Sequence, residues 1–166
     1  MSTPVPFPDG IFRALLDRII PEDDFPGATG AGVENYIVRQ LLGDCAHEKE
    51  EISRGLFSLE AEANARTGSC FTDLTPDDQD ALLRELEAGR SSINWSPTLP
   101  AAQFFTRVID LAHEGFYADP GNGGNRDGVS WRMIGYDPHL PEKPTASPPA
   151  LEPRHRRGGH LLPPSG

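Results

Sequence analysis

The chain has 166 residues and a formal net charge of -10, with 15 Lys and Arg against 25 Asp and Glu. This length suits one domain with a real hydrophobic core. The acidic balance argues against nucleic acid as a partner, because phosphate binding depends on clustered Lys and Arg. The sequence contains no run of 18 apolar residues, so we expect no direct membrane span. Cys45 and Cys70 are too few for a disulfide framework or a zinc site; we expect them to be reduced and buried, with a disulfide as the alternative.

Apolar residues recur at helical spacing along most of the chain. The first helix is predicted from Phe12 to Ile20, where Pro21 ends it. Further helices are expected over residues 32–42 and 47–66. No segment alternates with the period of two that is typical of strands, so we expect none beyond a short pairing near the C-terminal glycines.

Two more helices follow. Thr75-Pro76-Asp77-Asp78 combines an N-cap threonine, a proline at the first helical position and acids in the first turn, and Gly89 is expected to end this helix. The fifth begins near Pro100, and its predicted buried side is formed by Phe104, Phe105, Val108, Ile109, Ala112 and Phe116. The fold class predicted is therefore all-α: a small domain of about five helices.

A segment rich in glycine and aromatic residues follows the fifth helix. Residues 113–138 read HEGFYADPGNGGNRDGVSWRMIGYDP, with six glycines from Gly115 to Gly135. Each glycine loses roughly 0.5–1 kcal/mol more than alanine on folding, so a segment that also carries large aromatics is expected to be a long, ordered loop. Two interpretations stay open: Trp131 and Tyr136 anchor a partner, or they fold back on the chain's own helices.

We divide the chain after Tyr136, into a helical domain of residues 1–136 and a tail of residues 137–166. The tail has eight prolines and almost no apolar periodicity, so we expect it to be disordered or draped on a partner. Solubility or a weak contact explains its basic stretch, His155 to His160, better than metal binding does.

Known catalytic patterns do not emerge from the sequence. GNGGNRDG suggests a phosphate loop, but such loops follow a strand and open a helix, whereas this one follows a helix and is expected to open none. His113 and Glu114 are neighbours that point about 100° apart on a helix, so they form no ready acid–base pair. Glu22, Asp23 and Asp24 lack calcium-loop spacing, which favours a solvated acidic turn.

We therefore nominate no catalytic, metal-binding or cofactor-binding residues. An interaction subunit is the favoured interpretation. The alternatives are a stand-alone small-ligand or anion-binding module built on Gly121–Gly124, and an enzyme that uses the loop as a lid with His113 or Asp119 in its chemistry.

Several short segments point to a known family. They are RALLDRIIP (13–21) with DDFPGA (23–28), AGV (31–33) with Tyr36-Ile37, Phe71 before Leu74-Thr75, EGFYADP (114–120), GGNRD (123–127), Trp131 and IGY (134–136). In this order, from Phe12 to Tyr136, they resemble the small subunit, subunit 3, of membrane-associated, flavin-dependent gluconate 2-dehydrogenases. Asn122 and Asp137 depart from the family, where an aromatic residue and a proline are common.

The resemblance implies a non-catalytic small subunit that supports the folding, stability or assembly of a large catalytic one. That partner is expected to be a flavoprotein of the glucose–methanol–choline type, which binds FAD and oxidises a sugar or aldonate hydroxyl; a cytochrome c subunit is a further candidate partner. This chain itself is expected to hold no cofactor. The candidate partner interface consists of Glu114, Phe116, Tyr117, Asp119, Pro120, Gly123, Gly124, Asn125, Arg126, Trp131, Ile134 and Tyr136.

The expected location follows from the first residues. MSTPVPFPDG has neither a basic stretch before an apolar one nor a twin arginine, so the chain as written is expected to be cytoplasmic. The alternative is the periplasm or the membrane surface, if the partner exports the chain or its start is truncated.

Overall fold

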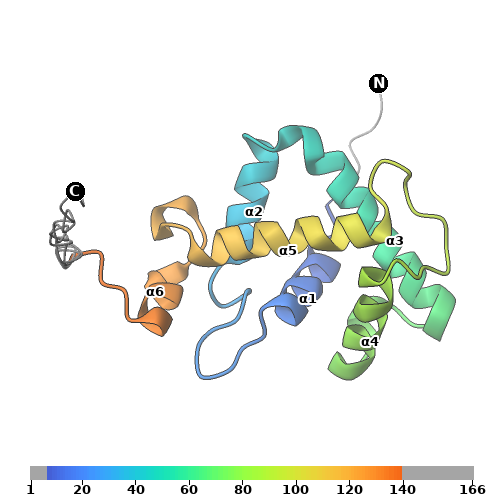
Figure 1. Cartoon of the computed structure of the whole chain (residues 1–166), viewed down its shortest axis with the longest axis horizontal. Helices are drawn as coiled ribbons and strands as arrows, with labels where there is room; N and C mark the ends of the chain where they lie inside the picture. The colour runs from blue at the N-terminus through green and yellow to red at the C-terminus, as the bar shows by residue number, and fades with distance from the viewer. Residues whose placement is uncertain (1–6, 140–166) are drawn as a thin grey trace, which may run out of the picture.

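The computed structural model describes residues 7–139, and all regular secondary structure in that range is helical. Six α-helices follow one another (Figure 1): α1 (Asp9–Ile19), α2 (Val33–Leu42), α3 (Lys49–Thr67), α4 (Pro76–Glu87), α5 (Ala101–Tyr117) and α6 (Val129–Ile134). Four short 3₁₀ helices lie between them: η1 (Ala46–Glu48), η2 (Phe71–Asp73), η3 (Pro120–Asn122) and η4 (Arg126–Gly128). The predicted all-α class is confirmed, and the first five α-helices lie close to their predicted positions.

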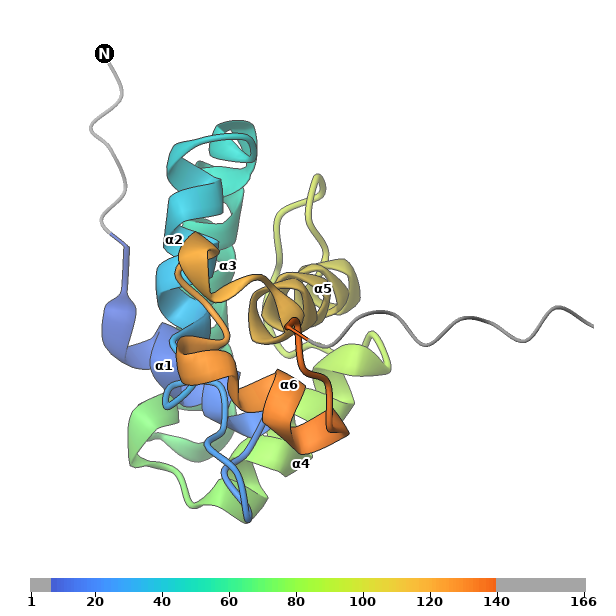
Figure 2. The same cartoon turned by 90° about the vertical axis from the view of Figure 1, so that its left-hand side faces the viewer.

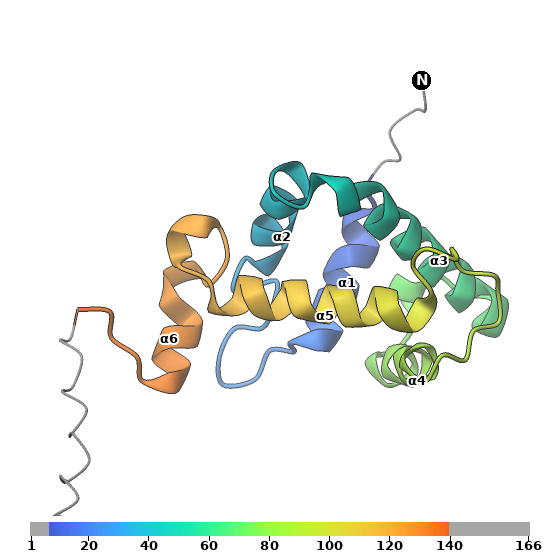
Figure 3. The ribbon, with the colours of Figure 1, turned by 45° about the horizontal axis from the view of Figure 1, so that its top comes forward.

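The long helix α5 crosses the middle of the fold (Figures 1 and 3) and packs chiefly against α2 and α4. Viewed nearly along its axis, it has α1, α2 and α3 to one side (Figure 2). Its buried side consists of Ala101, Phe104, Phe105, Val108, Leu111, Ala112, Gly115 and Phe116. Ile109 was predicted there but is only partly buried, because the face that enters the core is centred on Val108 and Leu111 instead.

Close helix contacts and helix caps account for much of this arrangement. Gly55 of α3 lies directly on the ring of Phe104, where a Cβ atom would collide with the aromatic carbons. The predicted start of α4 is confirmed: the Thr75 hydroxyl accepts the Asp78 N–H at 3.2 Å, and Pro76 takes the first helical position. Gly89 follows this helix with a φ of +74°, which suits its predicted place at the helix end.

The prediction that the glycine-rich segment opens no helix is wrong. After η3 and η4 it forms α6, which is bounded by left-handed glycines, Gly128 at φ +65° and Gly135 at φ +68°. Val129 in the first turn of α6 is buried in the core. The short strand pairing expected in this segment is not found among residues 7–139, where the backbone turns through helical conformations instead.

The cysteines are both free, so the disulfide alternative is wrong. Cys45 is half-buried, as a small apolar side chain can be, but Cys70 is exposed because Phe71, the next residue, takes the buried position. Residues 137–139 at the start of the predicted tail are exposed. The rest of that tail, including His155 to His160, lies outside the described residues.

Candidate functional site

The glycine-rich segment packs against the end of α5 by direct backbone contact. Gly124 lies so close to the carbonyl of Gly115 that no Cβ atom fits there, and Gly115 in turn faces the ring of Tyr36 on α2. Both glycines are buried. Glycine is therefore required at these two positions because there is no space for a side chain, and not because the backbone is flexible.

Asn125 joins the end of α5 to the start of α6. Its backbone is left-handed, with φ at 46°, and its side chain is fully buried. The side-chain Nδ2 donates to the Ala118 carbonyl at 2.8 Å, and Oδ1 accepts the Ser130 N–H at 2.9 Å. Asn125 thus satisfies one of the unpaired N–H groups that every helix N-terminus leaves.

Two further hydrogen bonds tie the segment to the N-terminal half of the fold. The Arg126 N–H donates to the Ala31 carbonyl at 2.8 Å, and the Arg39 guanidinium donates to the Gly121 carbonyl at 3.1 Å. The segment is consequently an ordered part of the domain, as its composition predicted.

The twelve predicted interface residues divide between the inside and the outside of the chain. Phe116, Gly124 and Asn125 are buried within it, and Pro120, Gly123 and Trp131 are half-buried. The exposed ones are Glu114, Tyr117, Asp119, Arg126, Ile134 and Tyr136. Some residues of the segment therefore pack on the chain's own helices, and others in the same segment are exposed and available to a partner.

Large apolar side chains gather on the outside of this end of the molecule. Tyr117 is 50% exposed, Met133 38%, Ile134 62% and Tyr136 53%; we call these four residues the α5–α6 apolar surface. Trp131 supports it, since its ring meets that of Tyr136 edge to face, with 5.4 Å between centroids. Clustered exposed side chains of this kind are typical of a protein–protein contact.

A hollow of about 250 Å³ opens beside this surface, between α5, α6 and the connection from α1 to α2. Figure 3 shows that connection running beside α6 under the end of α5. The lining residues are Ile19, Ile20, Pro21, Asp23, Phe25, Pro26, His113, Phe116, Tyr117 and Met133. The sequence analysis did not identify the residues that the α1–α2 connection contributes to this hollow. The aromatic residue Phe25, placed among acidic residues and prolines, could have indicated them.

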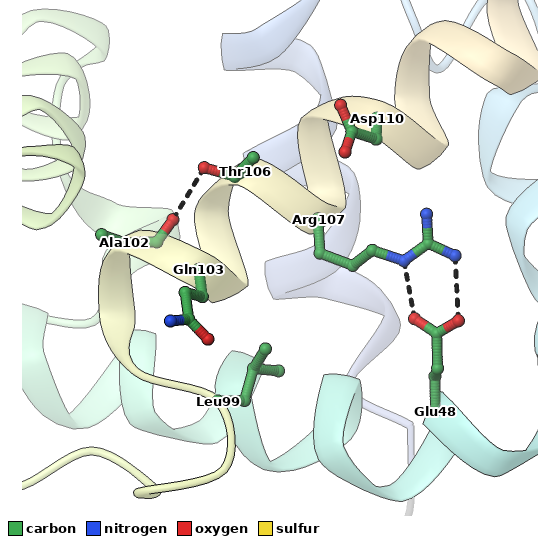
Figure 4. A pocket seen from close by; sticks show the side chains of 7 residues that line it. All are labelled: Glu48, Leu99, Ala102, Gln103, Thr106, Arg107 and Asp110. Carbon is green, nitrogen blue, oxygen red and sulfur yellow. Dashed lines mark hydrogen bonds and ion pairs between the residues drawn. The ribbon is translucent and has the colours of Figure 1, made fainter.

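A larger open groove, of about 460 Å³, lies along the first half of α5 (Figure 4). Its main charged group is already paired, because Arg107 binds both carboxylate oxygens of Glu48, at 2.6 and 2.9 Å. This bidentate contact holds the pKa of Glu48 below its usual value. Thr106 likewise donates to the carbonyl of Ala102 within its own helix, at 2.9 Å. Gln103 and Asp110 also line the groove, and neither side chain has a hydrogen-bond or ion-pair partner within residues 7–139, so the groove keeps one amide and one carboxylate free.

The predicted separation of His113 from Glu114 is confirmed. His113 lines the hollow, whereas Glu114 lies 3.8 Å from Arg107. Among the residues that the structure describes, no three His, Cys, Asp or Glu side chains lie close enough together to hold a metal ion. None of the helices within residues 7–139 combines the length and the apolarity needed to cross a membrane.

The anion-binding alternative needs free N–H groups in Gly121–Gly124. The Gly121 N–H donates to the Asp119 carboxylate at 2.8 Å, the Asn122 N–H to the Asp119 carbonyl at 2.8 Å and the Gly123 N–H to the Pro120 carbonyl at 3.2 Å. Three of the four donors are thus used within the turn, and a carboxylate stands where an anion would bind.

A family model described as gluconate 2-dehydrogenase subunit 3 matches residues 10–138, which is most of the chain. No curated protein and no solved structure matches it.

Proposed function

Since the chain belongs to the gluconate 2-dehydrogenase subunit 3 family, we propose that it is the non-catalytic small subunit of an FAD-dependent dehydrogenase acting on a sugar or aldonate hydroxyl. In this proposal the large subunit, of the glucose–methanol–choline type, binds FAD and carries out the oxidation. The small subunit supports the folding, stability and assembly of the large one. A cytochrome c subunit passes the electrons onward. We propose the cytoplasm as the site of assembly, with the periplasm as the alternative, and fractionation of the host distinguishes them.

The α5–α6 apolar surface is the observation that carries this proposal. Four large apolar side chains lie exposed together on a segment that the chain's own core holds in place through Gly124, Asn125 and Val129. A rigid base lowers the entropy that is lost when such side chains dock. Aromatic side chains are also the usual anchors of an interface, because they bury much area with few rotatable bonds.

The test is purification of the tagged full chain from its native host. The proposal predicts a larger protein at a fixed stoichiometry, a flavin absorbance spectrum, and reduction of an artificial electron acceptor when a sugar or aldonate is added. Purification of the folded chain without a flavoprotein would contradict it.

Trp131→Ala tests the contact itself. We expect this variant to capture at least about tenfold less flavoprotein, because the loss of an interface aromatic costs about 2 kcal/mol or more. Trp95→Ala is the matched control, since Trp95 is also half-buried but packs on Phe104, with 5.4 Å between ring centroids, away from this surface. Equal capture by both variants would remove Trp131 from the interface.

A further inference from the structure

The volume of the hollow beside the α5–α6 apolar surface and the charge of its rim indicate what kind of partner group binds there. We propose that it receives one bulky apolar side chain from a positively charged segment of the catalytic subunit. This inference rests on the proposed function and adds the chemistry of the contact: an apolar residue with Lys or Arg close to it in the partner's sequence.

The size of the hollow fits a single side chain. Its volume of about 250 Å³ is below the roughly 300–1,000 Å³ of pockets that enclose whole small molecules. Its walls are mainly apolar and come from Ile19, Ile20, Phe25, Phe116 and Met133. Phe116 is fixed in the core, so the floor of the hollow is preformed and does not have to be ordered on binding.

The rim of the hollow is acidic. Asp23 lines it, and Glu22 and Asp24 flank Asp23; all three side chains are exposed. One oxygen of Asp23 accepts the Phe25 N–H at 2.9 Å, but within residues 7–139 none of the three carboxylates forms an ion pair.

The facing elements bring little opposing charge. His113 on α5 lines the hollow, and on α6 Arg132 stands next to Met133. The guanidinium of Arg132 donates to the Asp127 carbonyl of its own segment. Arg132 keeps its positive charge in that hydrogen bond, but three carboxylates against one guanidinium leave the rim negative overall, and the complementary occupant is a cationic segment.

The same charges argue against a second copy of this chain as the occupant. In a homodimer both partners would be acidic, since each chain has a net charge of -10. In a two-fold dimer built on the hollow, both acidic turns would lie at one interface, where like charges repel. A partner with Lys or Arg at the contact turns this repulsion into attraction.

The experiment compares variants of the tagged full chain that are purified from the native host, with captured flavin as the readout. Met133→Asp places a charge in the wall of the hollow, and Met133→Leu is its conservative partner. Leu42→Asp is the matched control, because Leu42 is 65% exposed on α2 and does not line the hollow. We expect Met133→Asp to lower captured flavin at least about tenfold, with Met133→Leu and Leu42→Asp close to the unaltered chain.

A second set of variants tests the acidic rim. The triple variant Glu22→Gln, Asp23→Asn, Asp24→Asn is compared with Asp44→Asn, Glu87→Gln, Asp110→Asn, which changes the net charge equally at exposed positions elsewhere. We expect only the rim variant to lower the amount of captured flavoprotein, by about threefold to tenfold. Capture by the unaltered chain should fall as NaCl rises from about 50 to 500 mM, and capture by the rim variant should fall much less. Circular dichroism of each chain checks that it is folded.

The outcomes separate this inference from the proposed function. If the unaltered chain captures the flavoprotein and both Met133→Asp and the triple rim variant capture it equally well, the docking inference is wrong and the proposed function stands. If the unaltered chain captures no flavoprotein, the proposed function fails, and the inference fails with it. A homodimer that Met133→Asp dissociates would identify a second copy of the chain as the occupant and overturn the proposal. A Met133→Asp chain that is less compact but captures as much flavoprotein would identify the chain's own C-terminal residues as the occupant and overturn it as well.

Discussion

At the scale of single residues, Glu62 shows how this small domain fixes a long connection. Its side chain on α3 is fully buried and accepts hydrogen bonds from Arg66 Nε at 2.6 Å, the Ser92 N–H at 2.6 Å and Trp95 Nε1 at 3.4 Å. Burial acts to raise the pKa of Glu62, but the hydrogen bonds from Arg66, Ser92 and Trp95 outweigh it and leave the pKa below its ordinary value of 4.5. One carboxylate thus holds the connection between α4 and α5 to α3.

Glu62→Gln should lower the free energy of unfolding by about 1–3 kcal/mol at neutral pH, because the amide satisfies fewer donors and cannot neutralise Arg66. A carboxyl whose pKa is lower when folded stabilises the fold fully above its ordinary value, and the contribution is lost as pH falls through the folded value. The difference between the two proteins should therefore shrink below about pH 4.5. Urea unfolding at several pH values measures it, with the exposed Glu87→Gln as control. A difference that stayed constant with pH would rule out this role of the charge.

At the scale of elements, the five long helices were predictable because each buries a stripe of apolar residues at helical spacing. The stripe of α5 and the Thr75-Pro76 start of α4 carry most of that information. The short helix α6 was not predictable in the same way. It has six residues, and it forms because left-handed glycines bound it and the buried Asn125 supplies a hydrogen bond to its first turn.

The hollow escaped prediction for a related reason. Met133 is far in the sequence from Ile20 and Phe25, and it meets them only because Arg126 and Asn125 fix the path of the chain between α5 and α6. Periodicity within one segment carries no information on such a contact. The exposure of Tyr117, Ile134 and Tyr136 also depends on this path, so composition alone left folding back and outward presentation open.

Asn125→Ala should loosen α6 relative to α5. It leaves the Ser130 N–H and the Ala118 carbonyl without their partner and places alanine at a positive φ, so we expect a loss of about 1–3 kcal/mol in stability. Trypsin cleavage after Arg126 and Arg132 should become faster than in the unaltered chain. Asn122→Ala, at an exposed position of the same segment, is the control. Unchanged cleavage with Asn125→Ala would show that α6 is held by other contacts.

At the scale of the whole molecule, α5 connects the core to the candidate surface. Its first half packs with α3 and α4, and its last turn carries Phe116 into the core and Tyr117 to the outside, beside α6 (Figure 1). The exposed apolar residues of that end contrast with a chain of net charge -10. Within residues 7–139, four of the six exposed large apolar side chains lie at this end, which makes it the surface best suited to the proposed docking.

Hydrogen exchange of the purified complex, compared with that of the free chain, tests this account most directly. We predict slower exchange of the amides in Tyr117–Tyr136 and in residues 20–26 when the flavoprotein is bound, with little change in α3 and α4. Protection confined to α3 and α4, or no difference between bound and free chain, would contradict docking through the α5–α6 end.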